Sequence, residues 1–182
     1  MDVEQVQVFT AVLALAAATL ACAVVVGRLL RGRVRWLDEV MTAIDDAALW
    51  LAWLVAAVAT AGSLYFSESA HFTPCRLCWF QRCAMYPLAV ILLVAAIRRD
   101  RGIRWYAVPV AAIGAAISIY HYVLEWNPSL EGGACELTGP ACSFVWFREF
   151  GFVTLPFMAL CGFVTVIVLL VATRRPPTEE TT

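Results

Sequence analysis

Hydrophobic residues in this 182-residue chain gather into five long stretches, and the segments between them hold most of the charges. The length of each stretch is close to the 20 or so apolar residues, on the order of 30 Å of helix, that are needed to cross the hydrocarbon core of a bilayer. Backbone polar groups in lipid must find hydrogen-bond partners within their own segment, so each stretch is predicted to be an α-helix. The five predicted spans are residues 8–26, 47–66, 79–97, 105–124 and 152–172.

Composition favours an all-α integral membrane protein over a soluble domain. The chain is 62% hydrophobic and 15% charged, whereas soluble domains are about 45–50% apolar and about 25% charged. The excess of apolar residues therefore indicates contact with membrane lipid. A formal net charge of -1 gives no reason to expect a nucleic-acid partner.

Arginine positions predict how the chain lies across the membrane. Most arginines fall after the first span, between the third and fourth spans, and after the fifth, which is one side of a five-span chain. The positive-inside rule makes that side cytoplasmic, so the N-terminus is expected outside and the C-terminus inside. The first span is expected to be a retained anchor, because a cleaved signal peptide carries its positive charges before its apolar stretch. These arginines are Arg28, Arg31, Arg33, Arg35, Arg98, Arg99, Arg101, Arg104, Arg174 and Arg175.

The seven cysteines divide into two groups. Four lie in the two predicted outer loops, as the pairs Cys75/Cys78 and Cys135/Cys142, which is typical of an oxidising compartment. The other three lie inside apolar spans, where cysteine usually behaves as a small hydrophobic residue. These three are Cys22, Cys83 and Cys161.

Three interpretations of the outer cysteines compete: two structural disulfides, a four-thiolate zinc site, and a redox relay. A C-x-x-C motif alone decides little between them. The sequence Thr73-Pro74 is typical of an N-cap followed by the first helical residue, which would place Cys75 and Cys78 in the opening turns of a helix. The positive end of a helix favours a thiolate there. Arg82, four residues after Cys78, shares its helix face and favours the redox interpretation.

The second cysteine pair is expected to close a short, mobile loop. Turn-forming glycine and proline residues surround Cys135 and Cys142, and a disulfide in such a loop would be accessible to the thiols of another protein. The aromatic residues that follow, in residues 144–150, flank Arg148 and Glu149. This amphipathic segment is expected to lie on the membrane surface.

The chain resembles the DsbB/BdbC family of disulfide-bond formation proteins from about residue 49 to residue 171. The resemblance rests on the C-x-x-C motif, the arginine four residues after it, a His-Tyr pair in the next span and a Gly-Phe-x-Thr-x-Pro motif, all in order. It implies a four-helix transmembrane bundle at residues 47–173 in a bacterial plasma membrane. Residues 1–46 would then be an additional N-terminal transmembrane helix with a cytoplasmic linker, and residues 174–182 a disordered cytoplasmic tail.

The resemblance also implies a function for each outer cysteine. The family re-oxidises a DsbA-like thioredoxin-fold protein and passes the electrons to a membrane quinone, either menaquinone or ubiquinone. By this match Cys135 and Cys142 exchange with the partner protein, Cys75 and Cys78 form the membrane-proximal redox pair, and Cys78 faces the quinone. The closely spaced Cys135/Cys142 pair resembles the BdbC branch.

Two polar residues match positions near the quinone. Arg82 corresponds to the arginine that contacts the quinone in the family. His121 is expected to lie close to the same ligand. The alternative interpretation is that His121 has a structural role at the membrane interface, beside Glu125 and Trp126.

Overall fold

The computed structural model describes residues 2–32, 35–131 and 140–172, and within them it contains five helices long and apolar enough to cross a membrane. Three predicted spans lie wholly within these helices, the 47–66 span ends two residues past the second helix, and the fifth helix begins three residues after the start of the predicted 152–172 span. The chain is an all-helical multi-pass membrane protein, as the hydrophobic pattern predicted. The helices are α1 (Val3–Leu29), α2 (Arg35–Leu64), α3 (Arg76–Arg98), α4 (Arg104–Trp126) and α5 (Leu155–Ala172).

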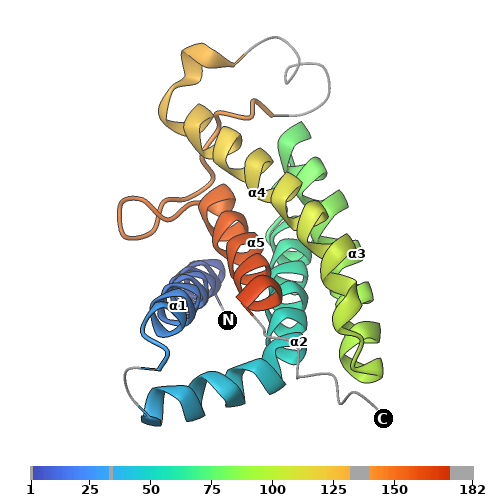
Figure 1. The fold of residues 1–182 in the computed structure, drawn as a ribbon. Coiled ribbons are helices and arrows are strands. Elements are labelled where there is room, and N and C mark those ends of the chain that lie inside the picture. The colour runs from blue at the N-terminus through green and yellow to red at the C-terminus, as the bar shows by residue number, and fades with distance from the viewer. Residues whose placement is uncertain (1, 33–34, 132–139, 173–182) are drawn as a thin grey trace.

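Three short helical segments adjoin the long helices. A π-helical turn, η1 (Tyr65–Ser69), extends α2, and the 3-10 turns η2 (Arg101–Ile103) and η3 (Pro128–Leu130) precede and follow α4. The cytoplasmic linker expected at the end of residues 1–46 is helical from Arg35 and continuous with α2. Figure 1 shows this first part of α2 running across the lower end of the bundle.

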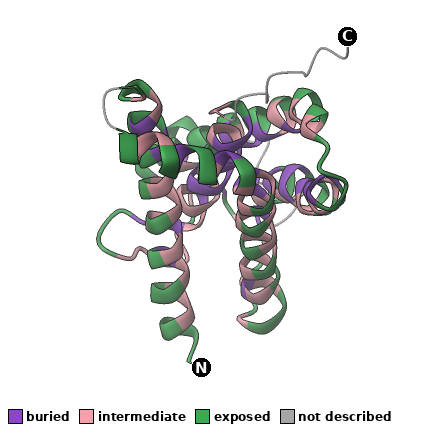
Figure 2. Cartoon of the chain, turned by 60° about the horizontal axis from the view of Figure 1, so that its bottom comes forward, coloured by how far each residue is buried: buried purple, intermediate pink, exposed green. Residues whose placement is uncertain are grey.

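Helix α5 is the centre of the arrangement, because it packs against α1, α2 and α4 (Figure 1). Helix α3 completes the bundle by packing between α2 and α4. Buried residues gather where the helices meet, and exposed residues cover their outer faces (Figure 2). Many of these outer residues are large and apolar, among them Val90, Ile97 and Ile113, as expected for a surface that faces lipid rather than water.

Helices α4 and α5 approach closely because of one glycine. A Cβ atom on Gly114 would lie 2.3 Å from the ring of Phe163, which is fully buried. Ala111, Ala115 and Ser118 continue the same buried face of α4. Small residues on this face let the two helices pack closely.

Ion pairs join the helices at the end of the bundle opposite the cysteine motif. Arg28 and Arg31 at the end of α1 bind the carboxylate of Asp45 in α2. Arg101 lies 3.5 Å from the carboxylate of Asp46. The arginine-rich segments after α1 and after α3 thus meet at one end of the protein, in agreement with the sequence prediction that they share a side. Arg33, Arg174 and Arg175 lie outside the described residues.

Candidate active site

The C-x-x-C motif lies where the loop after η1 enters α3. The helix begins at Arg76, and its N-cap is Cys75, whose sulfur accepts the backbone N–H of Cys78 at 3.3 Å. The prediction of Thr73 as the N-cap and Pro74 as the first helical residue was wrong by two positions. The Cys75 sulfur itself satisfies a free N–H at the helix start, and the Cys75 backbone is extended.

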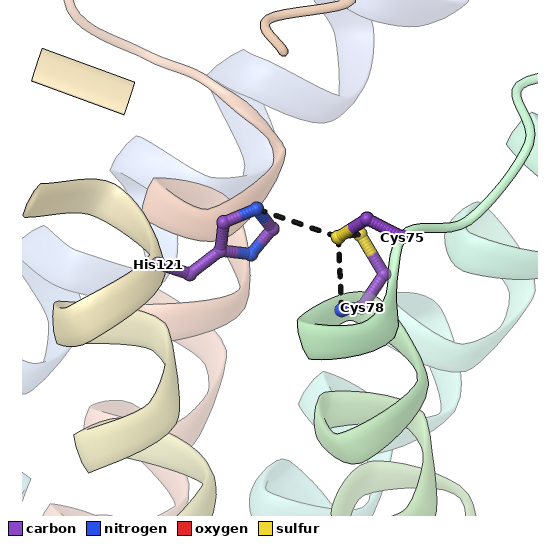
Figure 3. A group of neighbouring side chains, drawn as sticks. All are labelled: Cys75, Cys78 and His121. Carbon is purple, nitrogen blue, oxygen red and sulfur yellow. Dashed lines mark hydrogen bonds between the residues drawn. The ribbon is translucent and has the colours of Figure 1, made fainter. Parts of the chain in front are cut away.

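The two sulfurs of the motif lie together at the start of the helix (Figure 3). Cys75 Sγ is 2.8 Å from Cys78 Sγ, and both residues are free cysteines. Cys75 is buried, whereas Cys78 is half-buried. Because Cys75 is free, it forms no disulfide with Cys135 or Cys142 in this structure.

His121 on α4 connects the motif to the second cysteine pair. Its Nε2 atom lies 3.6 Å from Cys75 Sγ and 3.1 Å from the carbonyl oxygen of Cys142. A carbonyl oxygen only accepts hydrogen bonds, so this geometry places a proton on Nε2. The Nδ1 atom is buried and has no partner among the described residues.

Cys142 is fully buried and disulfide-bonded. The sequence had predicted an accessible disulfide in this loop, and for Cys142 that prediction was wrong. The loop folds back so that Cys142 packs with Cys75, Leu77 and Leu124. Glu131 fixes this position by accepting hydrogen bonds from the backbone N–H groups of Cys142 and Ser143. Cys135 lies outside the described residues.

The surroundings of Cys75 favour its thiolate. The hydrogen bond with Cys78 lowers the pKa of Cys75 most, burial acts in the opposite direction, and the hydrogen bond and charge of His121 lower the pKa further. The net result is a pKa well below that of an ordinary cysteine. Cys75 is therefore suited to act as a nucleophile or leaving group in thiol–disulfide exchange.

Alkylation of the reduced protein should reveal this thiolate. An ordinary thiol with a pKa of about 8.5 reacts about tenfold more slowly for each pH unit below that value. Cys75 is expected to keep its rate as the pH falls through neutrality and to lose it only in the acid range. Replacing His121 by Gln should move the loss to higher pH, because a group that lowers the pKa is gone. Peptide mass spectrometry after brief iodoacetamide treatment measures this.

The exposed His71 offers a matched control for that experiment. It lies in the loop before the motif with φ of 57°, a conformation that asparagine tolerates. His71→Asn should leave the pH profile of Cys75 unchanged. A wild-type profile that already falls between pH 8 and pH 7 would contradict the proposed thiolate.

An apolar cavity of about 370 Å³ lies directly beside Cys78. Its volume falls within the range of small-molecule sites, about 300–1,000 Å³. Helices α1, α2, α3 and α5 all contribute to its walls, mainly with aliphatic side chains. Cys78, Arg82 and Tyr86 line it from α3, so the predicted register of Cys78 with Arg82 is found in the structure. His121 contacts Cys75 and is not among the residues that line the cavity.

The polar groups of the cavity meet at Ser63 on α2. Arg82 donates from Nε to the Ser63 hydroxyl and from Nη2 to the Ser63 carbonyl oxygen, both at 3.0 Å. Tyr86 donates to the same hydroxyl at 3.1 Å. The Arg82 guanidinium also lies over the ring of Trp79, 5.3 Å from its centroid. Arg82 is therefore held at the cavity wall instead of extending to the membrane surface.

Stacked aromatic rings close the cavity on the cysteine side. Phe72 stacks on Trp146 with ring centroids 4.6 Å apart and on Phe66 at 5.7 Å, and all three line the cavity. Phe147 packs against Phe66 as well. The segment 144–150, which the sequence placed on the membrane surface, thus folds inward at Trp146 and Phe147. The aromatic content of the segment was the only sign in the sequence of this inward packing. Its partner rings lie more than 70 residues earlier in the chain, so no local pattern pairs them.

Comparison with known proteins places the chain in a family that forms disulfide bonds, which is consistent with a cysteine-based site. Residues 45–173 match the family described as "Disulfide bond formation protein DsbB". The chain belongs to the DsbB family. The match begins in α2 and contains α3, α4 and all of α5, together with all four outer cysteines, whereas α1 lies outside it.

Named proteins are similar to about two thirds of the chain. The chain is 45% identical over 124 residues to "Probable disulfide formation protein C 1" of Bacillus anthracis, which is 68% of this chain and 89% of that protein. It is 44% identical over 122 residues to "Disulfide bond formation protein C" of Bacillus subtilis (strain 168), or 67% and 88%. A "Probable disulfide formation protein" of Coxiella burnetii (strain CbuK_Q154) is 42% identical over 118 residues, or 64% and 80%. No solved structure matches the chain.

Membership of the DsbB family makes the protein a membrane thiol:disulfide oxidoreductase. Sequence reasoning had singled out Cys75, Cys78 and Arg82; in the structure Cys78 and Arg82 line one cavity, and Cys75 lies next to Cys78. It missed Ser63 and Tyr86, which are common residue types inside apolar spans and carry no motif. It also missed the contribution of α1, because that helix precedes the region covered by the family resemblance.

Proposed function

We propose that the protein re-oxidises a DsbA-like thioredoxin-fold partner and passes the electrons through its cysteine pairs to a membrane quinone. The observation that carries this proposal is the apolar cavity lined by both Cys78 and Arg82. A thiol that opens into an apolar cavity inside a membrane protein has access to a lipid-soluble electron acceptor. A structural disulfide needs no such cavity.

The donor set of the cavity fits a quinone. Its aliphatic walls suit the apolar ring and tail, and Arg82, Tyr86 and Ser63 offer donors for a carbonyl oxygen. Arg82 uses Nε and Nη2 to bind Ser63, and its third nitrogen, Nη1, makes no hydrogen bond with the described residues. When bound, a quinone would take up two electrons and two protons and leave as quinol.

The protein's own residues carry two exchange steps. In the first, a reduced partner thiolate attacks the Cys135–Cys142 disulfide, and the partner leaves oxidised while the loop pair becomes a dithiol. The burial of Cys142 favours Cys135 as the sulfur that the partner attacks, which leaves Cys142 as the thiol packed against Cys75. In the second, the loop dithiol reduces the Cys75–Cys78 disulfide and is itself re-oxidised. Each step moves two electrons.

His121 is placed to assist the second step. Its Nε2–H reaches both Cys75 Sγ and the Cys142 carbonyl, so it can stabilise a Cys75 thiolate as that sulfur leaves a disulfide. We infer that His121 acts on Cys75, whereas the family resemblance had suggested a place beside the quinone. Cys78 and Arg82 then remain as the residues that face the acceptor.

Orientation follows from the same relay. A secreted thioredoxin-fold partner requires the cysteine end to lie outside, and the arginine-rich end is then cytoplasmic by the positive-inside rule. The arginines that meet at Asp45 and Asp46 support this direction. We place the protein in the bacterial plasma membrane with its N-terminus outside.

Replacement of Arg82 by Ala tests the quinone site. Loss of hydrogen bonds from a charged donor costs about 1.5–3 kcal/mol, which corresponds to a rise in the KM for quinone of about 10- to 100-fold. Exchange with the partner should continue, because Arg82 does not contact Cys75 or Cys142. Arg98→Ala, at the far end of the same helix, is the matched control. An equal loss in quinone affinity and partner exchange would contradict the assigned role.

A metal site is the second candidate. The sulfur atoms of Cys75 and Cys78 and a ring nitrogen of His121 all lie within 4.8 Å of one another, close enough to hold a metal ion. Cys142 is disulfide-bonded, so it is not a thiolate ligand of the four-cysteine zinc site considered from the sequence. Metal analysis of the purified protein decides the matter. One tightly held zinc ion per chain, lost in His121→Gln, would favour a metal site over the relay.

A further inference from the structure

Helix α1 forms one wall of the cavity beside Cys78, although it lies outside the family match. The family match covers residues 45–173, and the aligned stretches of 122–124 residues take up 88–89% of the two Bacillus relatives. The remaining tenth of those proteins is too short for another spanning helix, which needs about 20 residues. The two Bacillus relatives therefore have no room for a counterpart of α1 beyond the aligned stretch.

The cavity face of α1 is a regular helical stripe. The α1 residues that line the cavity recur mostly at spacings of three or four, which is one side of an α-helix: Thr10, Leu13, Ala14, Ala16, Ala17 and Leu20. Two leucines contribute bulk to this wall, and the three alanines between them leave room. A ligand in the cavity would therefore meet a surface shaped by α1.

Contacts with α5 and α2 hold this wall in place. The Thr165 hydroxyl of α5 donates to the backbone carbonyl oxygen of Ala17 at 3.0 Å. At the other end of the helix, Gly27 packs so closely on Met41 that a Cβ atom would lie 2.7 Å from the methionine sulfur. Arg28 and Arg31 bind Asp45 just beyond. Helix α1 is thus fixed along its length rather than loosely attached.

The cavity extends much farther than a quinone ring. On α2 its lining runs from Ser63, at the level of Arg82, to Leu51. Twelve residues of helix rise by about 18 Å. The polar donors lie only at the Ser63 end, and the rest of the length between α1 and α2 is lined by aliphatic residues. This shape matches a polar head at one end and a long apolar tail along the helices.

We propose that α1 is the tail-binding wall of the quinone site and sets which isoprenoid tails the enzyme accepts. This inference rests on the proposed quinone function and deepens it. The ring binds between Cys78 and Arg82, and the first isoprenoid units lie along the Leu13, Ala17 and Leu20 side of α1. Family members without this helix would leave the same side of the tail open to lipid.

Two α1 variants test the proposal in the full-length protein, with dithiothreitol as the electron donor. Ala17→Leu fills part of the tail space, and Leu13→Ala removes an apolar contact. Each is assayed with one naphthoquinone bearing an isoprenoid tail and with the same ring bearing none. Both variants should raise the KM for the tailed quinone about tenfold and leave that for the tail-less quinone unchanged. Ala23→Leu, an exposed α1 position away from the cavity, is the control.

The outcomes separate this inference from the proposed function. If the wild type reduces neither quinone, the quinone function itself fails. If the wild type turns over but both α1 variants match Ala23→Leu, or change both quinones equally, the tail-binding role of α1 is wrong. Thermal unfolding of each variant identifies one that fails to fold, and Leu13→Ala, which introduces no bulk, then carries the test.

Discussion

Replacement of Cys78 by Ser is expected to abolish quinone reduction, by roughly a thousandfold or more, with any thiol donor. Cys78 is the only cysteine among the described residues that lines the cavity. A serine oxygen keeps the size of the side chain but cannot form the disulfide that releases two electrons. The absorbance change of the quinone during turnover by purified protein measures the loss.

Cys83 supplies the matched control for this substitution. It lies five residues later on α3, is exposed, and does not line the cavity. Cys83→Ser should therefore turn over at the wild-type rate. If Cys78→Ser reduced quinone as fast as Cys83→Ser, Cys78 could not be the residue that passes electrons to the quinone.

Replacement of Cys142 by Ser is expected to separate the two halves of the relay. Oxidation of a reduced thioredoxin-fold partner should fall by roughly a thousandfold or more, because the loop disulfide cannot form. Quinone reduction driven by dithiothreitol should remain, since the small dithiol can reduce Cys75–Cys78 directly and Cys78 still lines the cavity. Parallel assays with the two donors measure the difference.

A control must distinguish loss of the Cys142 thiol from loss of the packing around it. Cys142 is fully buried against Cys75 and Leu124, so a general loss of structure would reduce both activities together. The neighbouring Ser143→Ala change leaves both cysteine pairs intact and should preserve both activities. Equal loss with both donors in Cys142→Ser would contradict a separate, partner-facing function for the loop pair.

The sequence alone predicted the membrane-spanning helices well. Long apolar stretches must be helical in lipid, so α1 to α5 could be assigned within a few residues, and the register of Cys78 with Arg82 follows from helix geometry. The N-cap was misplaced because Thr73-Pro74 is a common helix start, whereas the Cys75 sulfur performs that function here. Propensity cannot anticipate a cap made by a rarer residue.

Long-range packing accounts for the rest of what the sequence did not predict. The burial of Cys142 depends on His121, Glu131 and Leu124, and the aromatic closure of the cavity joins Phe72 with Trp146. The α1 wall depends on which side of α5 the first helix occupies. Each of these contacts joins segments far apart in the chain, and no local pattern specifies such a pairing.

The central claim is that electrons from a protein dithiol reach a quinone through this chain. The most direct measurement mixes the purified protein with a reduced thioredoxin-fold donor and quinone, and follows donor disulfide and quinol together. We predict catalytic turnover in which one quinol forms for each donor disulfide, because each exchange step moves two electrons. Donor oxidation without quinol, or no turnover with either menaquinone or ubiquinone, would contradict the account.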